Sequence, residues 1–442
     1  MRFRTGFLIL LLTIFACQKE DIIQNKESEQ KQNNNGQNQE EKEDTPKPDD
    51  NTYKGLIPED IDCLPEVWIN TPGAKGVWDK YNWVELSTIE IKAGKDGSLK
   101  SVFKADSVKI KGRGNTTWWS YPKKPYRFNL SHKANFIGSG ETRKWVLLAN
   151  WMDRTLLRNA VAFEAARQTS IEWTPSGTFV EFYLDGNHLG NYWMGEKINV
   201  EKGNFLADYL LEFDTSDGNG GDFQSAKGSS WHKPSGELPV NIKYPDLDDT
   251  DHPADTIKAA KKALETIEAA LYVNNNTDVI DIDSFADWFL VYELTLNGEP
   301  GHPKSCYMYI RDGKLYAGPV WDFDWGTFPA KGRVPKYFIN KDHLYYNKLF
   351  TIPAFKTRLK ERWVELKPKF ADLADYIDQQ ANWIRASESV NHVMWDCYPN
   401  PCGEENGMVN YDENLSFDEA VKTMRESLLA RIVIMDKLIK EL

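Results

Sequence analysis

Asp322 and Asp324 are two acidic residues whose spacing suits a metal ion. They lie in the stretch WDFDWGTF at the end of an expected strand, and on an extended chain alternate residues point to the same face. Both have aromatic neighbours, and burying a carboxylate among apolar groups is costly unless it is paired or binds a cation. Mg²⁺ is commonly held by one or two carboxylates together with phosphate oxygens. The pattern predicts a Mg²⁺ site, with a carboxylate that caps backbone N–H groups of a turn as the alternative.

A second acidic stretch, LNGEPGHPKS, precedes this one in the chain. Glu299, His302 and Lys304 fall in a Gly- and Pro-rich loop between an expected helix and an expected strand. Such a loop could present Glu299 as a general base, and solvated turn charges are the alternative. A glycosidase would instead use Glu299 with Asp322 or Asp324 as its two carboxyl groups, and the sequence leaves that alternative open.

The stretch IKGRGNTTWWSYPKKPYRF contains a polar glycine turn. Backbone N–H groups in such a turn can bind phosphate oxygens. We therefore predict that a phosphate group of a nucleotide lies against Arg113, Gly114 and Asn115.

The same stretch places Lys123 and Lys124 on the strand expected after the turn. A strand lysine can contact the α and β phosphates of a nucleotide and pair with a helix glutamate, and Glu164 on the next expected helix is the candidate partner. The alternative is an edge strand with solvated lysines. For Trp118 and Trp119, core packing is expected of at least one.

Short strands dominate the first half of the sequence, and helices dominate beyond Thr250. The expected strands are 83–93, 106–112, 125–131 and 144–151, followed by a helix over 153–168 capped by Asp153, a hairpin over 177–200 and a strand within 209–223. The later expected elements are helices over 255–273 and 283–298, a hairpin over 305–328, and helices over 355–377 and 417–442. The fold class is therefore α+β, with a strand-rich first lobe over residues 56–200 and a mostly helical second lobe over 201–442, whose embedded hairpin carries the WDFD motif.

The N-terminus has the pattern of a lipoprotein signal peptide over residues 1–16. A basic start precedes a short apolar run and the box IFAC, so Cys17 is expected to be acylated; an ordinary cleavage site is the alternative. The following QKED resembles the signal that sends some Bacteroidetes-type lipoproteins to the cell surface. Residues 17–55 are the acylated cysteine and a disordered tether rich in Gln, Asn, Glu and Lys. We expect a lipid-anchored protein of the outer membrane or cell surface, held to the membrane through this lipid only.

The formal net charge of −12 disfavours nucleic acid as a main partner, because phosphate backbones select basic surfaces. An exported chain permits disulfides, and Cys397 and Cys402 in CYPNPC are either a bridged pair or free thiols. The seven His residues show no paired metal-ligand spacing.

Several motifs together resemble the CotH kinase family, the spore-coat-protein-H-like atypical protein kinases. They are RGNTTW, KKPYRF, KWVLLANWMDRTLLRNAVAFEAAR, LGNYWMGEKI, LLEFD and GPVWDFDWGTF, in this order between about Leu56 and Ala330. The resemblance implies a diverged, two-lobed protein-kinase-like fold. It also implies transfer of the ATP γ-phosphate to Ser or Thr of an unidentified protein substrate, with ATP and Mg²⁺ as cofactors. A catalytically inactive, kinase-like surface lipoprotein that binds a glycan or a protein is the alternative.

The resemblance also implies roles for individual residues. Lys124, or its neighbour Lys123, would contact the nucleotide phosphates and Glu164 would orient that lysine. The segment Gly195 to Asn199, with Glu196 and Ile198, would lie beside adenine. Asp322 would bind Mg²⁺ together with Asp324.

The sequence departs from the family pattern at two positions of the acidic loop. Glu299 stands where Asp is usual and Ser305 where Asn often follows. Glu is one methylene longer than Asp, so a base or metal ligand at this position would be displaced. Ser305 would have to replace the amide as a metal ligand.

Overall fold

The computed structural model describes residues 64–95, 103–136, 141–201, 204–216, 220–234, 236–395, 412 and 414–442. All of them belong to one compact unit, Tyr53–Leu442. The predicted signal peptide, Cys17 and the tether lie outside the described residues, as do Cys63, Cys397 and Cys402. Cys306 is buried with a free thiol. Within the described part of the chain, no helix is both long and apolar enough to span a membrane.

The first sheet is a closed seven-stranded barrel with the strand order β1-β2-β3-β4-β5-β7-β6. Antiparallel pairs make most of it, and the parallel pair of β1 with β6 closes it. Inward-facing apolar side chains fill its interior, among them Ile110, Phe128 and Trp145. The strands are β1 Glu66–Asn70, β2 Val84–Lys92, β3 Phe103–Gly112, β4 Tyr126–Ala134, β5 Thr142–Leu148, β6 Gly177–Leu184 and β7 Asn187–Glu196.

The glycine turn between β3 and β4 runs into a short helix, α1 Thr116–Ser120. Gly114 has φ +81°, and a Cβ atom there would lie 2.3 Å from the Thr117 hydroxyl oxygen, so glycine is required. Trp118 packs into the barrel core, as expected for one of the two tryptophans, while Trp119 is exposed. Strand β4 begins only at Tyr126, so the expectation that Lys123 and Lys124 lie on that strand is wrong.

The second sheet has five strands in the order β12-β11-β8-β10-β9. The hairpin expected over 305–328 is therefore part of a larger sheet, because β11 also pairs with β8. The short strand β9 and the alternating strand β10 were not anticipated. The strands are β8 Tyr209–Phe213, β9 Phe223–Ser225, β10 Leu238–Tyr244, β11 Cys306–Arg311 and β12 Lys314–Ala317.

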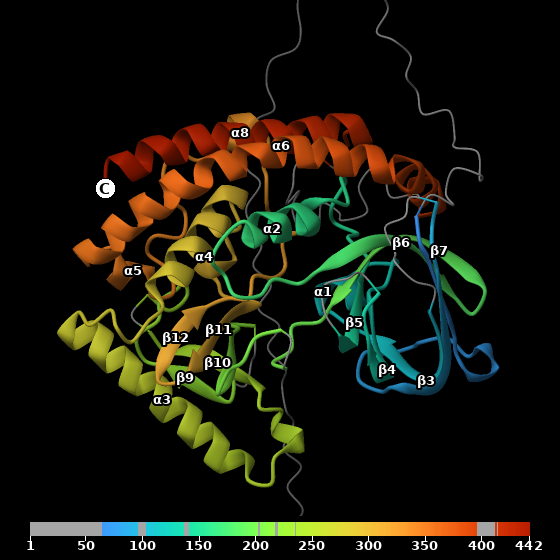
Figure 1. The fold of residues 1–442 in the computed structure, drawn as a ribbon, viewed down its shortest axis with the longest axis horizontal. Helices are drawn as coiled ribbons and strands as arrows, with labels where there is room; N and C mark the ends of the chain where they lie inside the picture. The colour runs from blue at the N-terminus through green and yellow to red at the C-terminus, as the bar shows by residue number, and fades with distance from the viewer. Residues whose placement is uncertain are drawn as a thin grey trace, which may run out of the picture. The chain divides into compact units, whose positions relative to one another are not determined.

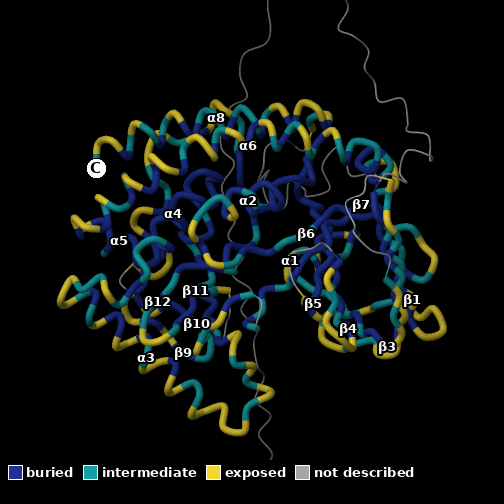
Figure 2. The backbone as a smooth tube through the Cα atoms, viewed as in Figure 1, coloured by how far each residue is buried: buried dark blue, intermediate teal, exposed yellow. Residues whose placement is uncertain are grey.

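The longer helices cover this second sheet (Figure 1). Helix α4, Ile282–Thr295, is buried on nearly all sides, and Figure 2 shows it in dark blue beneath the outer helices. The long helices α6, Pro353–Trp395, and α8, Phe417–Lys440, lie side by side over it, and α3, Pro253–Asn274, packs near β9 and β12. Figure 2 shows that these three helices expose one face and bury the other. The class of mixed helices and sheets is thus confirmed, and the two-lobed kinase-like arrangement stays a prediction.

Helix α2, Arg158–Arg167, begins five residues later than the sequence pattern suggested. The preceding residues form a turn in which the Asp153 carboxylate accepts the N–H groups of Thr155 (2.9 Å) and Arg158 (2.7 Å). Asp153 therefore caps the first turn of α2 by accepting the Arg158 N–H, and the predicted capping role of Asp153 is confirmed, although the residue lies outside the helix. The fully buried Arg158 side chain is paired with Asp153 and Asp412, which joins α2 to the C-terminal part of the chain.

Candidate functional site

A cavity of about 650 Å³ brings the predicted acidic and phosphate-binding residues together. Its volume lies within the range of about 300–1,000 Å³ that is typical of small-molecule sites. The β3–β4 turn contributes one wall and strands β8, β10 and β11 contribute another. Of the residues predicted from the sequence, those lining it are Arg113, Gly114, Asn115, Glu299, His302, Lys304, Ser305, Asp322 and Asp324.

Five carboxyl groups line this cavity, those of Glu212, Asp214, Glu299, Asp322 and Asp324. Burial raises the pKa of Asp324 well above its ordinary value, and the negative charge of Asp322 adds to the effect. The pKa of Asp322 is raised by burial too, although the Arg113 guanidinium and a hydrogen bond with Asp324 oppose this. Burial also raises the pKa of Glu299 well above its ordinary value, with a further contribution from Asp322. Like charges in a buried site disfavour ionisation, so a cation placed here would relieve the repulsion.

These carboxyl groups fit a Mg²⁺ ion that keeps phosphate and water ligands. Mg²⁺ prefers hard oxygen donors and is usually held by one or two protein carboxylates rather than by an all-protein cage. Among the described residues, no group of three or more His, Cys, Asp or Glu side chains is arranged to hold a metal by itself. Asp322 and Asp324 therefore suit a shared site in which the remaining ligands come from a phosphate group.

Two buried amide side chains hold the backbone of the WDFD motif. Asp322 has φ +67°, a left-handed conformation that is uncommon for a residue with a side chain. The Asn297 amide nitrogen donates to the Asp322 carbonyl oxygen (3.0 Å). On the other side of the same peptide group, the Phe323 N–H donates to the Asn159 amide oxygen (2.8 Å). The peptide between Asp322 and Phe323 is thus hydrogen-bonded at both ends.

Lys80, Arg113, Lys243 and Lys304 line the cavity together with its acidic residues, and Lys197 interacts electrostatically with Arg113 and Lys243 without lining it. Burial lowers the pKa of Lys197 to about 7, and the positive charges of Arg127, Lys144, Lys243 and Arg113 lower it further. Lys243 is paired with Glu212 (2.8 Å), and both line the cavity. A group of cations that repel one another beside a cavity is electrostatically suited to a polyanionic ligand.

The predicted pair of a lysine with Glu164 is not formed. Lys124 donates to the Trp118 carbonyl oxygen (2.5 Å) and lies over that indole ring. Glu164 accepts hydrogen bonds from Arg167 (3.0 Å) and Gln168 (2.5 Å) on its own helix. Lys124 and Glu164 do not line the 650 Å³ cavity. The physical reason is the late start of β4: both lysines lie in the loop between α1 and β4, where backbone carbonyl oxygens accept their hydrogen bonds.

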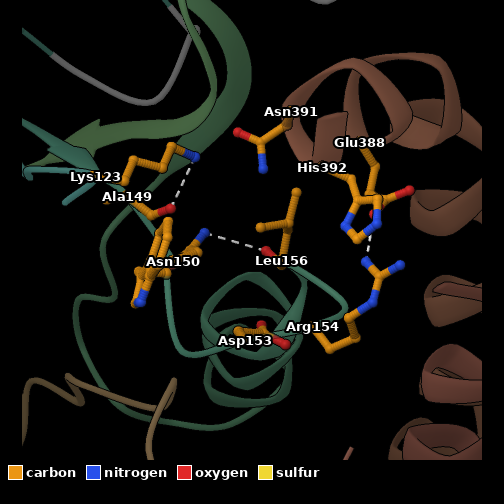
Figure 3. Close-up of a pocket in the computed structure, with 10 residues that line it drawn as sticks. Lys123, Ala149, Asn150, Asp153, Arg154, Leu156, Glu388, Asn391 and His392 are labelled. Atoms are coloured by element: carbon orange, nitrogen blue, oxygen red, sulfur yellow. Dashed lines mark hydrogen bonds and ion pairs between the residues drawn. The ribbon is translucent and has the colours of Figure 1, made fainter. Parts of the chain in front are cut away.

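Lys123 is buried at a second, much smaller cavity of about 10 Å³ (Figure 3). Its ammonium group donates to the Ala149 (3.0 Å) and Asn191 carbonyl oxygens and lies over the Tyr192 ring. Figure 3 shows Glu388, Asn391 and His392 on the opposite wall, on α6. This cavity has room for about one water molecule, so Lys123 has a structural environment and is not at the phosphate-sized site.

The segment predicted to lie beside adenine also falls outside the large cavity. Glu196, at the end of β7, is buried and accepts the Ser176 N–H (3.3 Å). Ile198 packs into the main hydrophobic core. Asn199 lines a separate cavity of about 320 Å³ with Lys144. Lys197, between Glu196 and Ile198, does not line the large cavity either, but its charge interacts with those of Arg113 and Lys243, which do.

Sequence reasoning missed several residues that build the site. Asn241 and Lys243 line the cavity from β10, and their alternation with the buried Val240 and Ile242 is a strand signal present in LPVNIKY. Asn297 lies in the acidic stretch LNGEPGHPKS, but its role depends on a contact with Asp322 that the order of residues in the chain does not reveal. Asn159 likewise lies in the helix expected over 153–168, but the sequence analysis assigned it no role.

Comparison with models of known protein families gives a match. The family model described as CotH kinase protein matches residues 108–432, most of the chain. No curated protein matches the sequence. The matched region contains the glycine turn, the acidic loop and the WDFD motif.

Proposed function

Because the chain belongs to the CotH kinase protein family, we propose that it transfers the γ-phosphate of ATP to a Ser or Thr hydroxyl of a protein substrate. The observation that carries this proposal is a cavity lined by both carboxyl groups, Glu299, Asp322 and Asp324 among them, and basic side chains, Arg113 and Lys243 among them. Phosphoryl transfer depends largely on positioning and on stabilising negative charge. A cavity with cation-binding and anion-binding side chains supplies both requirements.

Each of these two groups of side chains has a distinct role in this proposal. Asp322 and Asp324 would hold Mg²⁺, which neutralises phosphate charge when it is bound. Arg113 lies over the Trp321 ring, 5.4 Å from its centroid, and lines the cavity with Lys243. These two cations would bind phosphate oxygens and stabilise the charge that develops in the transition state.

Glu299 is the proposed acceptor of the proton from the substrate hydroxyl. Its backbone N–H donates to the Asn297 side-chain oxygen (2.9 Å), which fixes the start of the acidic loop. A raised pKa makes its ionised form a stronger base, and a neighbouring cation favours ionisation.

The first experiment is a thermal melt of the purified protein with ATP, with and without Mg²⁺, and of the variant Asp322→Asn. We expect a Mg²⁺-dependent upward shift in the wild type that the variant loses, because ligands that bind the folded state raise the melting temperature. A wild-type protein without any shift at millimolar ATP would contradict the kinase proposal. Transfer of labelled phosphate to candidate proteins, followed by identification of the modified residue, then tests the Ser/Thr assignment.

A second candidate function is a kinase-like protein that binds a glycan or a protein without phosphoryl transfer. The observation that favours it is the absence of the lysine–glutamate pair, together with the half-exposed Trp325 at the cavity and the exposed Trp231 beside it. In this case Asp322→Asn would leave ligand binding unchanged.

The setting of the reaction is part of the proposal. We propose that Cys17 carries the lipid anchor and that the tether of residues 17–55 holds the folded part at the outer membrane or cell surface. ATP and an unidentified protein substrate would be its partners, the membrane would be reached through the lipid only, and nucleic acid would not be bound.

A further inference from the structure

The backbone at Asp322 is held in an uncommon conformation by two residues from different parts of the chain. Its φ of +67° carries a conformational cost that surrounding contacts must offset. Those contacts come from Asn297, just after helix α4, and from Asn159, in the first turn of helix α2. Both side chains are buried.

Both amide groups use a donor and an acceptor, which fixes their orientations. The Asn297 nitrogen donates to the Asp322 carbonyl oxygen while its oxygen accepts the Glu299 N–H. The Asn159 oxygen accepts the Phe323 N–H, and its nitrogen donates to the Asn150 side-chain oxygen (3.0 Å). The side chain of Asn297 therefore links Asp322 to Glu299 directly.

We infer that Asn159 and Asn297 are positioning residues that hold the Asp322–Phe323 peptide so that the Asp322 carboxylate faces the cation site. This inference rests on the proposed function, since it concerns the same cavity. In this chain α2 is joined to the WDFD motif by Asn159, and Glu164 on the same helix is turned to Arg167 and Gln168. A shift of α2 would therefore move the acidic site through the hydrogen bond between the Asn159 side chain and the Phe323 N–H.

Aromatic contacts support the same connection between α2 and the motif. Phe163, one turn beyond Asn159, lies 5.7 Å from the Trp321 ring and 6.3 Å from the Phe323 ring, centroid to centroid. Arg158 donates to the Thr327 carbonyl oxygen (3.1 Å). Helix α2 therefore contacts the motif before, within and after the aspartates, and a change in its register would move them.

The test compares Asn159→Leu, Asn159→Asp and Asn297→Ala with a matched control, Asn191→Ala. Asn191 is equally buried and donates to the Ser387 hydroxyl (2.9 Å), but it does not line the cavity. We expect Asn159→Leu and Asn297→Ala to weaken Mn²⁺ binding, measured by electron paramagnetic resonance, by about 10- to 100-fold, as is common for residues that orient metal ligands. Asn159→Asp keeps the acceptor for the Phe323 N–H but loses the donor to Asn150, so it should weaken Mn²⁺ binding less than Asn159→Leu does.

The double variant Asn159→Leu/Asn297→Ala separates positioning from general loss of stability. Both residues hold the same peptide group. The loss of Mn²⁺ affinity in the double variant should therefore be smaller than the sum of the losses in the two single variants. Unchanged Mn²⁺ affinity in both single variants, with loss in Asp322→Asn, would overturn the inference and leave the proposed function intact. Loss of Mn²⁺ binding in none of these variants, Asp322→Asn included, would contradict the cation site itself.

Hydrogen exchange provides a readout that needs neither metal nor activity. The Phe323 amide should exchange slowly in the wild type and faster in Asn159→Leu, while Asn191→Ala leaves it unchanged. Rapid exchange of this amide in the wild type would overturn the inference even if the substituted proteins fail to fold.

Discussion

At the residue scale, Asp322 and Asp324 show how the side chains of a binding site can lower the stability of the folded protein. Burial raises the pKa of both carboxyl groups, and the negative charge of Asp322 raises the pKa of Asp324 further. Functional sites often retain such unfavourable contacts because a ligand relieves them. The free protein should therefore be less stable than its packing would allow.

Asp322→Asn should raise the melting temperature of the protein in the absence of divalent cations by about 1 to 4 °C. The change removes the negative charge that raises the pKa of Asp324 and leaves an amide that can donate to Asp324. Calorimetry in the presence of a chelator measures the effect. Asp283→Asn is the control, because Asp283 is paired with Arg358 (2.6 Å) and should lose stability instead. A lower melting temperature for Asp322→Asn would contradict the prediction.

Lys197 should make nucleotide affinity depend on pH. Its pKa is about 7 in the folded protein and 10.5 in an unfolded chain, so between these values the unfolded state binds more protons and stability rises with pH. A polyanion favours the charged lysine, so binding above pH 7 requires proton uptake. We expect ATP affinity, measured by titration calorimetry, to fall from about pH 7 to pH 9 and the slope to be smaller in Lys197→Met. An equal slope in both proteins would exclude Lys197 as the group responsible.

The two adjacent lysines should differ sharply in their contributions to stability. Lys123→Met leaves buried carbonyl groups without their donor, which costs about 1–3 kcal/mol for each such group. Lys124→Met removes one half-buried hydrogen bond and should cost about 1 kcal/mol or less. Urea unfolding checks both values. A large, specific loss of ATP affinity in Lys124→Met would instead restore the phosphate role first expected from the sequence.

At the element scale, one buried ion pair joins the last helix to the centre of the molecule. Arg431 on α8 pairs with Glu293 on α4, and both side chains are fully buried. Arg431 also donates to the carbonyl oxygens of Glu293 (2.9 Å) and Pro335 (2.7 Å). Because α4 leads directly into Asn297 and Glu299, this pair supports the helix from which the acidic loop extends.

Arg431→Met should lower the free energy of unfolding by about 3–5 kcal/mol, because it leaves the Glu293 carboxyl buried without its partner. The double variant Glu293→Gln/Arg431→Met should recover part of this loss, since the uncompensated charge is removed. Urea unfolding of the three proteins gives the comparison. A double variant less stable than Arg431→Met would show that the hydrogen bonds of Glu293 to Ile339 and Asn340 matter more than its charge.

The same scale shows which elements the sequence could predict. Long periodic segments such as α3, and the turn Asp185-Gly186-Asn187 between β6 and β7, were predicted because their signals are local. Strand β9 has only three residues, which is too short for a periodic pattern. The lysines of KKPYRF were predicted to belong to the strand that follows them, whereas they lie in the preceding loop, where Lys124 donates to the Trp118 carbonyl oxygen.

At the scale of the whole molecule, the acidic residues of the site were predicted better than the groups that hold them. Asp322, Asp324 and Glu299 have a chemistry that their sequence context reveals. Lys243, Asn159 and Asn297 are polar residues on ordinary elements, and their roles arise from contacts between segments far apart in the chain. Local patterns contain no information about such contacts, so this part of the site needed the structure.

The anchor proposed for the N-terminus is testable at this scale. Cys17→Ser should move the protein from the membrane fraction to the soluble fraction of cells that express it, because stable attachment would depend on the acyl chains. Immunoblots of fractionated cells measure the distribution, and Cys306→Ser is the matched control. A membrane-bound Cys17→Ser protein would contradict lipid anchoring through this cysteine.

The pairing of Glu293 with Arg431 also sets the order in which the chain can reach its final state. During synthesis Glu293 leaves the ribosome long before Arg431, so a nascent chain without its last helix would have to bury an uncompensated carboxylate. Folding is therefore disfavoured until the C-terminus has been made. In the export that we propose for this lipoprotein, such a delay would keep the chain unfolded while it crosses the membrane.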